Sequence, residues 1–272
     1  MRIRVFIVFH KAIDERLIFQ PFSQNEIDRL FSLYAVSERY PDKLVTRMDG
    51  RTLVATAEPD RIIAEPLLHW YDPNIQSRGF METSCYVHLL KNDLVAAFDY
   101  VGVAQYDMSW TAAAADMLRA LERGAPESGP QFAFGLTCGT LMDKFGRFHH
   151  WAFPHLRNWN FLLMSYNRFF GQNWDLTILI DKPFTLFQTY LLPRAEFVAL
   201  ANWVAALCEE VYPWANQPPY ETHWGALSGY VERAESLFIA ARLHERRIML
   251  NHLPLRHDDT IPVRLGIRKL HY

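Results

Sequence analysis

Asp107 is the first residue of this sequence that could do chemistry at the end of a strand. The apolar run Tyr100–Ala104 is too short for a helix and contains no proline, so it predicts a buried β-strand. Gln105, Tyr106 and Asp107 follow it directly. Ligands of open α/β sheets bind just beyond the carboxyl ends of strands, where a carboxylate can hold a divalent cation or a sugar hydroxyl. Asp107 or Ser109 could equally cap the helix that follows, so both interpretations stay open here.

The elements that would position such residues alternate between strands and helices. A capping box links Ser23 and Glu26, and the helical spacing after it continues through Tyr34. Apolar runs predict strands over 2–9, 100–105, 132–137, 184–192 and 248–250. Further helices are predicted over 78–91, 111–123, 158–170, 197–211 and 225–243. We therefore expect an α/β fold with a mostly parallel central sheet flanked by helices and a helical C-terminal part. Strands 2–9 and 100–105 should be neighbours, because strand-helix-strand units favour parallel pairing.

Composition argues against several classes of function. The 272 residues carry a formal net charge of −2, which does not favour a nucleic-acid partner. Neither a Gly-x-Gly-x-x-Gly nor a Walker sequence occurs. Cys85, Cys138 and Cys208 are too widely spaced for a disulfide framework or a zinc cluster, and fit a reducing compartment. No segment resembles a signal sequence or a membrane span, so we expect a cytoplasmic protein with at most peripheral membrane contact.

Aromatic residues make up 14% of the chain, which suits stacking against sugar rings but is also typical of core packing. The cluster Phe148-His149-His150-Trp151 is interpreted as packing or acceptor surface, because adjacent histidines on a regular helix cannot face one metal ion. Glu82 and Tyr86 lie four residues apart on a predicted helix. Taken alone, they could be a solvated acid beside a half-buried tyrosine.

Five motifs in order resemble those of bacterial and viral glycosyltransferases from capsular and exopolysaccharide loci, often known only as a domain of unknown function. That family opens with a strand ending in His-Lys and continues with an acidic-aromatic helix ending in Lys-Asn. A Tyr-x-Gly strand, an Asn-Met-Phe-like strand and a Gly-Phe-x-x-Glu-Arg helix follow. The matching segments are Phe9-His10-Lys11, Glu82–Asn92, Tyr100–Trp110, Leu186–Glu196 and Gly229–Arg233.

One departure from the family lies at the central strand, where Gln105-Tyr106-Asp107-Met108 replaces His-Tyr-Arg-Arg. The segment is thus closer to the degenerate Asp-x-Asp of metal-using glycosyltransferases. The resemblance implies a GT-A-like fold and a nucleotide-sugar donor, UDP- or GDP-linked, with a glycan acceptor in cell-surface polysaccharide synthesis. The length of the chain predicts one large domain, or one domain with a helical appendage. We expect a single domain over residues 1–272, with the nucleotide-sugar half over about 1–125 and the acceptor half over about 126–272.

The reaction that the resemblance implies sets what the site must contain. Negative charge grows on the leaving pyrophosphate, and Mn²⁺ or Mg²⁺, or cationic side chains, must neutralise it. We expect Asp107 to be a metal ligand, with His252 or His257 as the second. Glu232 is the candidate base for the acceptor hydroxyl, although an ion pair with Arg233 on the helix surface is equally open. The expected donor-binding residues are His10, Lys11, Glu82, Tyr86, Gln105, Tyr106 and Arg233.

Two other classes of function stay open at this point. A metal-dependent hydrolase could use Asp107 with the C-terminal histidines and Asp258-Asp259. A non-catalytic module could bind a carbohydrate or a nucleotide without the chemistry of the family.

Overall fold

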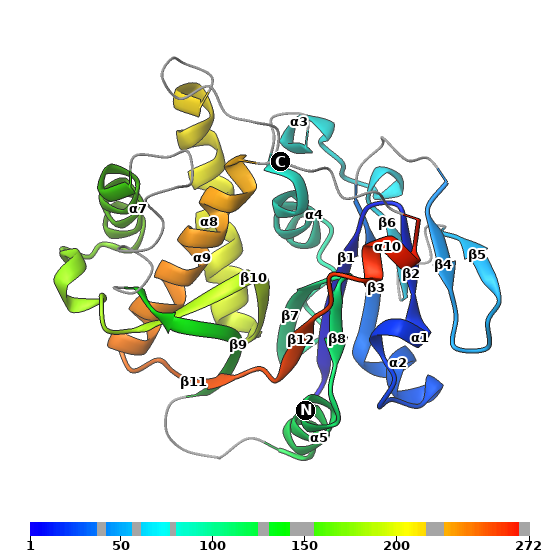
Figure 1. Cartoon of the computed structure of the whole chain (residues 1–272). Coiled ribbons are helices and arrows are strands. Elements are labelled where there is room, and N and C mark those ends of the chain that lie inside the picture. Colours follow the sequence, from blue (N-terminus) through cyan, green and yellow to red (C-terminus); the bar gives the residue numbers. More distant parts are fainter. Residues whose placement is uncertain are drawn as a thin grey trace.

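A seven-stranded sheet runs through the centre of the molecule (Figure 1). The structure is a computed structural model, and it describes residues 1–36, 42–55, 61–76, 80–124, 131–141, 155–215 and 226–266. Its strands are β1 (Ile3–Phe9), β3 (Phe31–Ala35), β6 (Ile62–Ala64), β7 (Tyr100–Gln105), β9 (Gln131–Thr140), β10 (Pro183–Pro193) and β11 (Ile248–His252). Their order across the sheet is β11-β9-β10-β7-β1-β3-β6.

Around the sheet lie helices and two smaller sheets. The described α-helices are α1 (Glu15–Ile18), α2 (Gln24–Leu30), α3 (Pro73–Ile75), α4 (Ser84–Lys91), α5 (Ala112–Arg123), α7 (His155–Phe170), α8 (Arg194–Ala215), α9 (Ala226–His244) and α10 (Ile261–Arg264). Short 3-10 turns are η1 (Glu65–Leu67), η3 (Met81–Thr83) and η5 (Leu176–Ile178). The smaller sheets pair β2 (Ala12–Asp14), β4 (Leu44–Thr46) and β5 (Thr52–Val54), and β8 (Met108–Trp110) with β12 (Leu255–His257).

Strand direction confirms the mostly parallel sheet. β1 pairs in parallel with both β3 and β7, β3 with β6, and β9 with β11. β10 alone among the seven runs antiparallel to its neighbours β7 and β9. The carboxyl ends of the other six strands therefore meet at one edge of the sheet, where ligands bind in folds of this class. The predicted adjacency of segments 2–9 and 100–105 is confirmed by the β1–β7 ladder.

Successive side chains of β1 point to opposite faces of the sheet and pack into two separate hydrophobic cores. Val5, Ile7 and Phe9 belong to one buried cluster, whereas Phe6 and Val8 belong to the other. The first cluster takes residues from α1, α2 and α5, and the second from α4, α7, α8 and α9. Helices thus cover both faces of the sheet, as predicted. A strand buried on both sides is expected to be a nearly continuous apolar run, and in β1 Arg4 is the exception.

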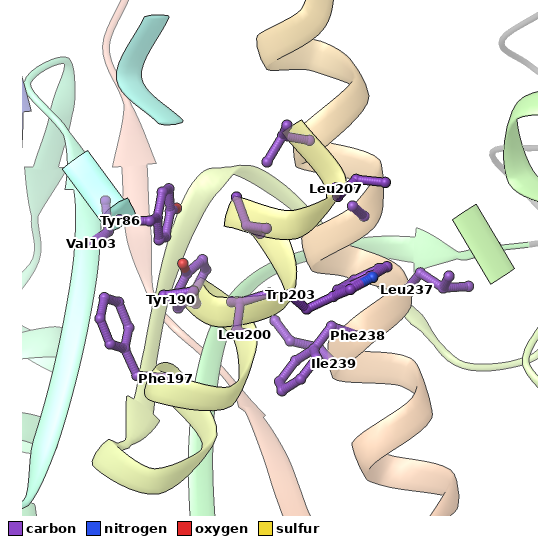
Figure 2. Close-up of a cluster of buried hydrophobic side chains, with 14 of the residues drawn as sticks. Tyr86, Val103, Tyr190, Phe197, Leu200, Trp203, Leu207, Leu237, Phe238 and Ile239 are labelled. Carbon is purple, nitrogen blue, oxygen red and sulfur yellow. The ribbon is translucent and has the colours of Figure 1, made fainter. Parts of the chain in front are cut away.

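The larger core is built around Trp203 of α8 (Figure 2). Trp203 is fully buried, and its indole meets Tyr166 of α7 edge to face at 5.3 Å between ring centroids. Its Nε1 donates to Ser165 Oγ at 3.2 Å, so the polar atom of the indole is satisfied. Burying a side chain of this kind contributes on the order of 1.5–3 kcal/mol, so the apolar stripe predicted over 197–211 is core packing.

One predicted helix ends earlier than its spacing suggested. The capping box of Ser23 and Glu26 is present, but α2 stops at Leu30 and Phe31 already belongs to β3. Val5 pairs with Phe31 and Val8 with Tyr34 in the β1–β3 ladder. A fully buried parallel strand also reads as a continuous apolar run, so helical spacing at these positions was incidental.

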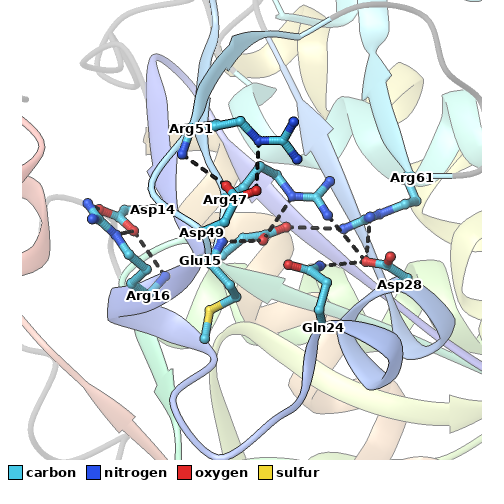
Figure 3. A network of polar contacts seen from close by, with 10 residues as sticks. Asp14, Glu15, Arg16, Gln24, Asp28, Arg47, Asp49, Arg51 and Arg61 are labelled. Carbon is cyan, nitrogen blue, oxygen red and sulfur yellow. Dashed lines mark hydrogen bonds and ion pairs between the residues drawn. The ribbon is translucent and has the colours of Figure 1, made fainter.

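A network of charged side chains anchors the chain just after β1 (Figure 3). Glu15 is fully buried and accepts from Arg47 Nε at 3.1 Å, from Arg61 at 3.2 Å and from the Met48 amide at 3.1 Å. Burial raises the pKa of Glu15, and the two guanidinium groups oppose that rise. The network ties the start of α1, directly after β2, to the end of β4 and the start of β6.

In the described part of the chain, the helices are all too short or too polar to cross a lipid bilayer.

The aromatic and histidine cluster over 148–151 lies outside the described residues, so its interpretation stays a prediction.

Candidate functional site

The candidate site lies at the edge where the parallel strands end. Val8 of β1 pairs with Gln105 of β7, and the amide of Tyr106 donates to Val8 O at 3.1 Å. The residues after both strands therefore emerge side by side. The rings of His10 and Tyr106 meet edge to face with centroids 6.4 Å apart.

His10 forms an ion pair with Glu82, a residue of η3 that is 72 positions away in the sequence. His10 Nε2 lies 2.7 Å from Glu82 Oε1, and both side chains are 17% exposed. Burial acts to raise the pKa of Glu82, but the charge of His10 and its hydrogen bond outweigh burial and hold that pKa below its usual value. The solvated-acid interpretation of Glu82 is therefore wrong.

Asp107 and His257 form a second pair at the same edge. His257 Nε2 lies 3.2 Å from Asp107 Oδ2, and the side chains are 31% and 21% exposed. The antiparallel pairing of β12 with β8 brings them together, and the Asp258 amide donates to Asp107 O at 2.9 Å. His257 Nδ1 lies 3.6 Å from Asp259 Oδ1 on its other side. The imidazole thus stands between two carboxylates.

The second carboxylate oxygen of Asp107 has no protein partner among the described residues. Asp107 Oδ1 is buried and accepts no hydrogen bond there. A buried carboxylate oxygen without a donor or a cation is costly, so this atom suits an external ligand. Carboxylate oxygen and imidazole nitrogen are ligand types for Mn²⁺, and Mg²⁺ is bound through one or two carboxylates plus phosphates.

Helix capping does not account for Asp107. Thr111 is the N-cap of α5, and its side chain accepts from the Ala114 amide at 3.2 Å. Ser109 lies within β8, and its hydroxyl donates to Leu17 O at 3.5 Å. The prediction that Asp107 or Ser109 caps this helix is wrong, because β8 intervenes between β7 and α5.

The two predicted histidine ligands differ in position. His252 ends β11 and exchanges a hydrogen bond with Thr137 at 2.9 Å, whereas His257 contacts Asp107. Groups of three or more His, Cys, Asp or Glu side chains arranged to hold a metal ion do not occur within the described ranges. The residues present would fit a cation that takes its other ligands from the phosphates of a substrate.

Tyr86 and Glu235 are buried side chains close to one another. Tyr86 packs between Tyr190 and Phe197, with ring centroids 6.1 Å and 6.0 Å away, so this predicted donor-binding residue is part of the core and is not exposed to a ligand. Glu235 of α9 is 1% exposed. Burial raises the pKa of Glu235 well above its usual range, the Tyr86 hydroxyl opposes this, and the nearby Glu232 and Glu82 carboxylates add to it. Glu235 was missed because sequence alone gives no signal for a buried acid.

Four other predicted residues are half-buried near the site. Lys11 follows His10, and Gln105 ends β7. Glu232 and Arg233 lie on α9, which packs against β10 and η3. Arg233 donates to Gly229 O at 3.1 Å within the helix. Burial lowers the pKa of Arg233, and Glu232 opposes that change. The roles of these residues stay predictions.

Comparison with known proteins concerns the fold. No model of a known protein family matches this chain, and no curated protein matches it. A solved apo structure of the bifunctional glycosyltransferase WbbM is similar, with a TM-score of 0.58, 10% sequence identity, and coverage of 95% of this chain and 46% of that chain. This chain thus spans about half the length of that protein. An apo structure of mouse xyloside xylosyltransferase 1 also matches, at a TM-score of 0.32 and 7% identity, over 91% of this chain and 85% of that chain. The GT-A-like fold is confirmed, and membership of the capsular family stays a prediction.

Proposed function

We propose that this protein is a glycosyltransferase that moves a sugar from a nucleotide-sugar donor to a glycan acceptor. The observation that carries the proposal is the Asp107–His257 pair at the carboxyl end of β7, with one carboxylate oxygen buried and unsatisfied by the described residues. The fold shared with a bifunctional glycosyltransferase supports it. The resemblance to the capsular family extends it to a UDP- or GDP-sugar donor and to cell-surface polysaccharide synthesis.

The donor diphosphate would bind at the edge formed by β1 and β7. Asp107 and His257 would hold Mn²⁺ or Mg²⁺, which when bound neutralises charge on the diphosphate. His10 and Lys11 would contact the nucleobase or phosphate, with Glu82 fixing the orientation of the His10 ring through its 2.7 Å contact. Because the Glu82 carboxylate engages Nε2, the His10 imidazole has one defined orientation toward a bound nucleotide sugar.

Glu232 would act as the base that accepts the proton of the acceptor hydroxyl. It is half-buried on α9, and its charge reaches the buried Glu235. A base must stand within hydrogen-bond reach of the proton that it takes. α9 belongs to the C-terminal half, about 126–272, which we assign to the acceptor, while about 1–125 would bind the donor. Arg233 would orient Glu232 or contact phosphate.

A thermal-shift screen tests this proposal. Purified protein is heated with UDP-, GDP- and CMP-sugars, each with and without Mn²⁺, and the stabilised pairs are then assayed for transfer to glycan acceptors. A ligand at 100 times its Kd raises the free energy of unfolding by about 2.7 kcal/mol, which is readily measured. We expect one donor class to stabilise the protein, and more strongly with Mn²⁺.

The other outcomes of the screen identify the other classes of function. Donor binding without transfer to any acceptor would indicate a non-catalytic binding module. Metal-dependent release of phosphate or sugar in the absence of an acceptor would indicate a hydrolase. Melting curves unchanged by every nucleotide sugar would contradict the proposal.

A further inference from the structure

Strand β10 contains a bulge with an unusual backbone. From Thr185 to Tyr190 is five steps along β10, whereas their partners Thr137 and Gly135 are only two steps apart on β9. Within the bulge, Phe187 has φ 57° and Gln188 has φ 47°. Two consecutive non-glycine residues in the left-handed region are rare, and a bulky side chain there is a genuine outlier.

Surrounding contacts hold this backbone in place. Gln188 is 5% exposed, and its Nε2 donates to Ser228 O on α9 at 3.1 Å. The Thr189 hydroxyl donates back to Phe187 O at 2.9 Å. Strained residues persist only where their surroundings over-determine them, and they cluster at functional sites. Bulges likewise re-aim side chains next to active sites.

The bulge directs Phe187 at the candidate site. The β10–β7 ladder begins at the pair Tyr190–Val103, so Phe187 lies beyond the paired region, on the side where β7 ends. Its ring stacks on the His257 imidazole, with centroids 4.7 Å apart and an interplanar angle of 17°. Phe187 remains 36% exposed, so the stacked pair of rings borders solvent.

Contacts on several sides hold the His257 ring, among them the Asp107 carboxylate at Nε2, Asp259 on the Nδ1 side and the face of Phe187. The two carboxylates set which nitrogens are engaged, and the stacked ring sets the plane of the imidazole. Side chains around a metal ligand commonly fix its orientation in this way.

We propose that Phe187 is a positioning residue that holds the His257 imidazole in the plane from which Nε2 reaches a ligand shared with Asp107. The proposal rests on the proposed function in one respect, since the shared ligand is the divalent cation of the donor site. The bulge, with its positive φ at Phe187, places the ring of Phe187 against His257.

The test compares Phe187→Leu with the wild type, with Phe187→Tyr as the conservative variant and Phe169→Leu as the matched control. Phe169 is an exposed phenylalanine on α7, 44% exposed, and its ring meets that of Phe170 edge to face. Two readouts are used. The first is the Kd for Mn²⁺ by calorimetry, measured in the presence of saturating UDP or GDP because phosphates would complete the ligands of the cation. The second is the Cε1–H resonance of His257 in metal-free protein, assigned with His257→Gln. A melting temperature for each variant separates positioning from folding.

We expect Phe187→Leu to bind Mn²⁺ about tenfold more weakly, the usual lower limit for losing an orienting neighbour of a metal ligand. Its His257 resonance should lose the ring-current shift and broaden. Phe187→Tyr should retain both properties of the wild type, and Phe169→Leu should change neither. Phe187→Gly should behave like Phe187→Leu toward Mn²⁺ without a lower melting temperature, because glycine accepts a positive φ.

An unchanged Mn²⁺ affinity in Phe187→Leu, or an unchanged His257 resonance apart from the ring-current shift, would overturn the inference. A wild-type protein that binds no Mn²⁺ would instead contradict the metal site of the proposed function. The resonance would then decide the inference alone: a broadened, mobile His257 ring in Phe187→Leu supports positioning, and a sharp one refutes it.

Discussion

Asp107 is a carboxylate with one oxygen engaged by His257 and the other buried with no partner in the described residues. We predict that Asp107→Asn abolishes the Mn²⁺ dependence of donor binding, because an amide is a poor substitute for a charged ligand. Donor affinity measured against Mn²⁺ concentration checks this.

Thr111→Ala is the matched control for Asp107→Asn, since Thr111 is the true N-cap of α5. Loss of this cap should lower the free energy of unfolding by about 1 kcal/mol and leave the Mn²⁺ titration unchanged. Identical titrations in the wild type and Asp107→Asn would refute the metal-ligand role of Asp107.

Glu232 permits a second prediction about a single side chain. Glu232→Gln should abolish sugar transfer while donor affinity stays close to that of the wild type, because the change removes a base without removing volume. Rates of transfer and donor Kd are measured on the same preparation. Full activity in this variant would return Glu232 to an ion pair on the helix surface.

The positions of strand ends were predicted from the sequence more successfully than the contacts between residues that follow different strands. That His10 follows one strand and Asp107 another could be read from apolar runs, because strand ends are local properties. The contact of His10 with Glu82, and the choice of His257 over His252 beside Asp107, depend on pairings between segments 72 and 150 residues apart. Nothing in local spacing encodes those pairings.

At the scale of elements, α2 is fixed by a single glutamate with two roles. Glu26 accepts from the Ser23 amide at 2.8 Å in the capping box, and from Arg119 Nε of α5 at 2.7 Å. The pKa of Glu26 is lowered to about 2, mainly by the hydrogen bond from Arg119 and next by the hydrogen bond from the Ser23 amide. Glu26 thus joins the start of one helix to the side of another.

This lowered pKa predicts a dependence of stability on pH. The pKa of Glu26 in the folded protein lies below its unfolded value of 4.5, so its stabilisation is complete above pH 4.5 and is lost as pH falls toward 2. Allowing for solvent screening, we expect Glu26→Gln to lose roughly 1–2 kcal/mol at neutral pH. Urea unfolding at pH 7 and pH 3 gives the decrease in the free energy of unfolding caused by acid. This decrease should be smaller in Glu26→Gln than in the wild type, and equal decreases would contradict the prediction.

Elements predicted from strong local signals agree with the structure, and the exceptions have a physical cause. The capping box at Ser23 and the stripe along α8 were both read from sequence. The bulge at Phe187 was not, because β10 reads as one uninterrupted apolar strand and the contacts of the bulge, such as that of Gln188 with α9, are made with segments distant in the sequence. β8 was also missed, since a three-residue strand carries too little pattern to recognise.

The whole molecule depends on close contact between β7 and its neighbours at Gly102. A Cβ added there would lie 2.8 Å from Tyr190 O, 3.2 Å from Leu191 Cδ1 and 3.3 Å from Val5 Cγ2. A backbone carbonyl in a paired strand cannot move aside, so Gly102→Ala would force β1 or β10 away from β7. We predict a loss of about 1–3 kcal/mol in the free energy of unfolding, typical of overpacking a core.

Gly229→Ala is the control for this substitution. Gly229 lies in α9, and among the described residues outside the adjacent helix backbone no atom lies within 4 Å of an added Cβ. Alanine should stabilise the helix by about 0.5–1 kcal/mol. In chemical unfolding, the free energy of unfolding should therefore fall below that of the wild type in Gly102→Ala and rise above it in Gly229→Ala. A free energy of unfolding in Gly102→Ala equal to that of the wild type would contradict the close packing of the sheet.

The 150 residues between Asp107 and His257 also set when the site can exist. At about 5–20 residues per second, a ribosome needs roughly 8–30 s to make that interval. During this interval β1, β3, β6 and β7 have already been synthesised and can pair with one another. Until β10 is made, the edge of β7 that pairs with β10 stays unpaired and open to other chains. A chain interrupted before β12 has no His257, so it cannot bring a second ligand to Asp107, whatever the earlier strands have built.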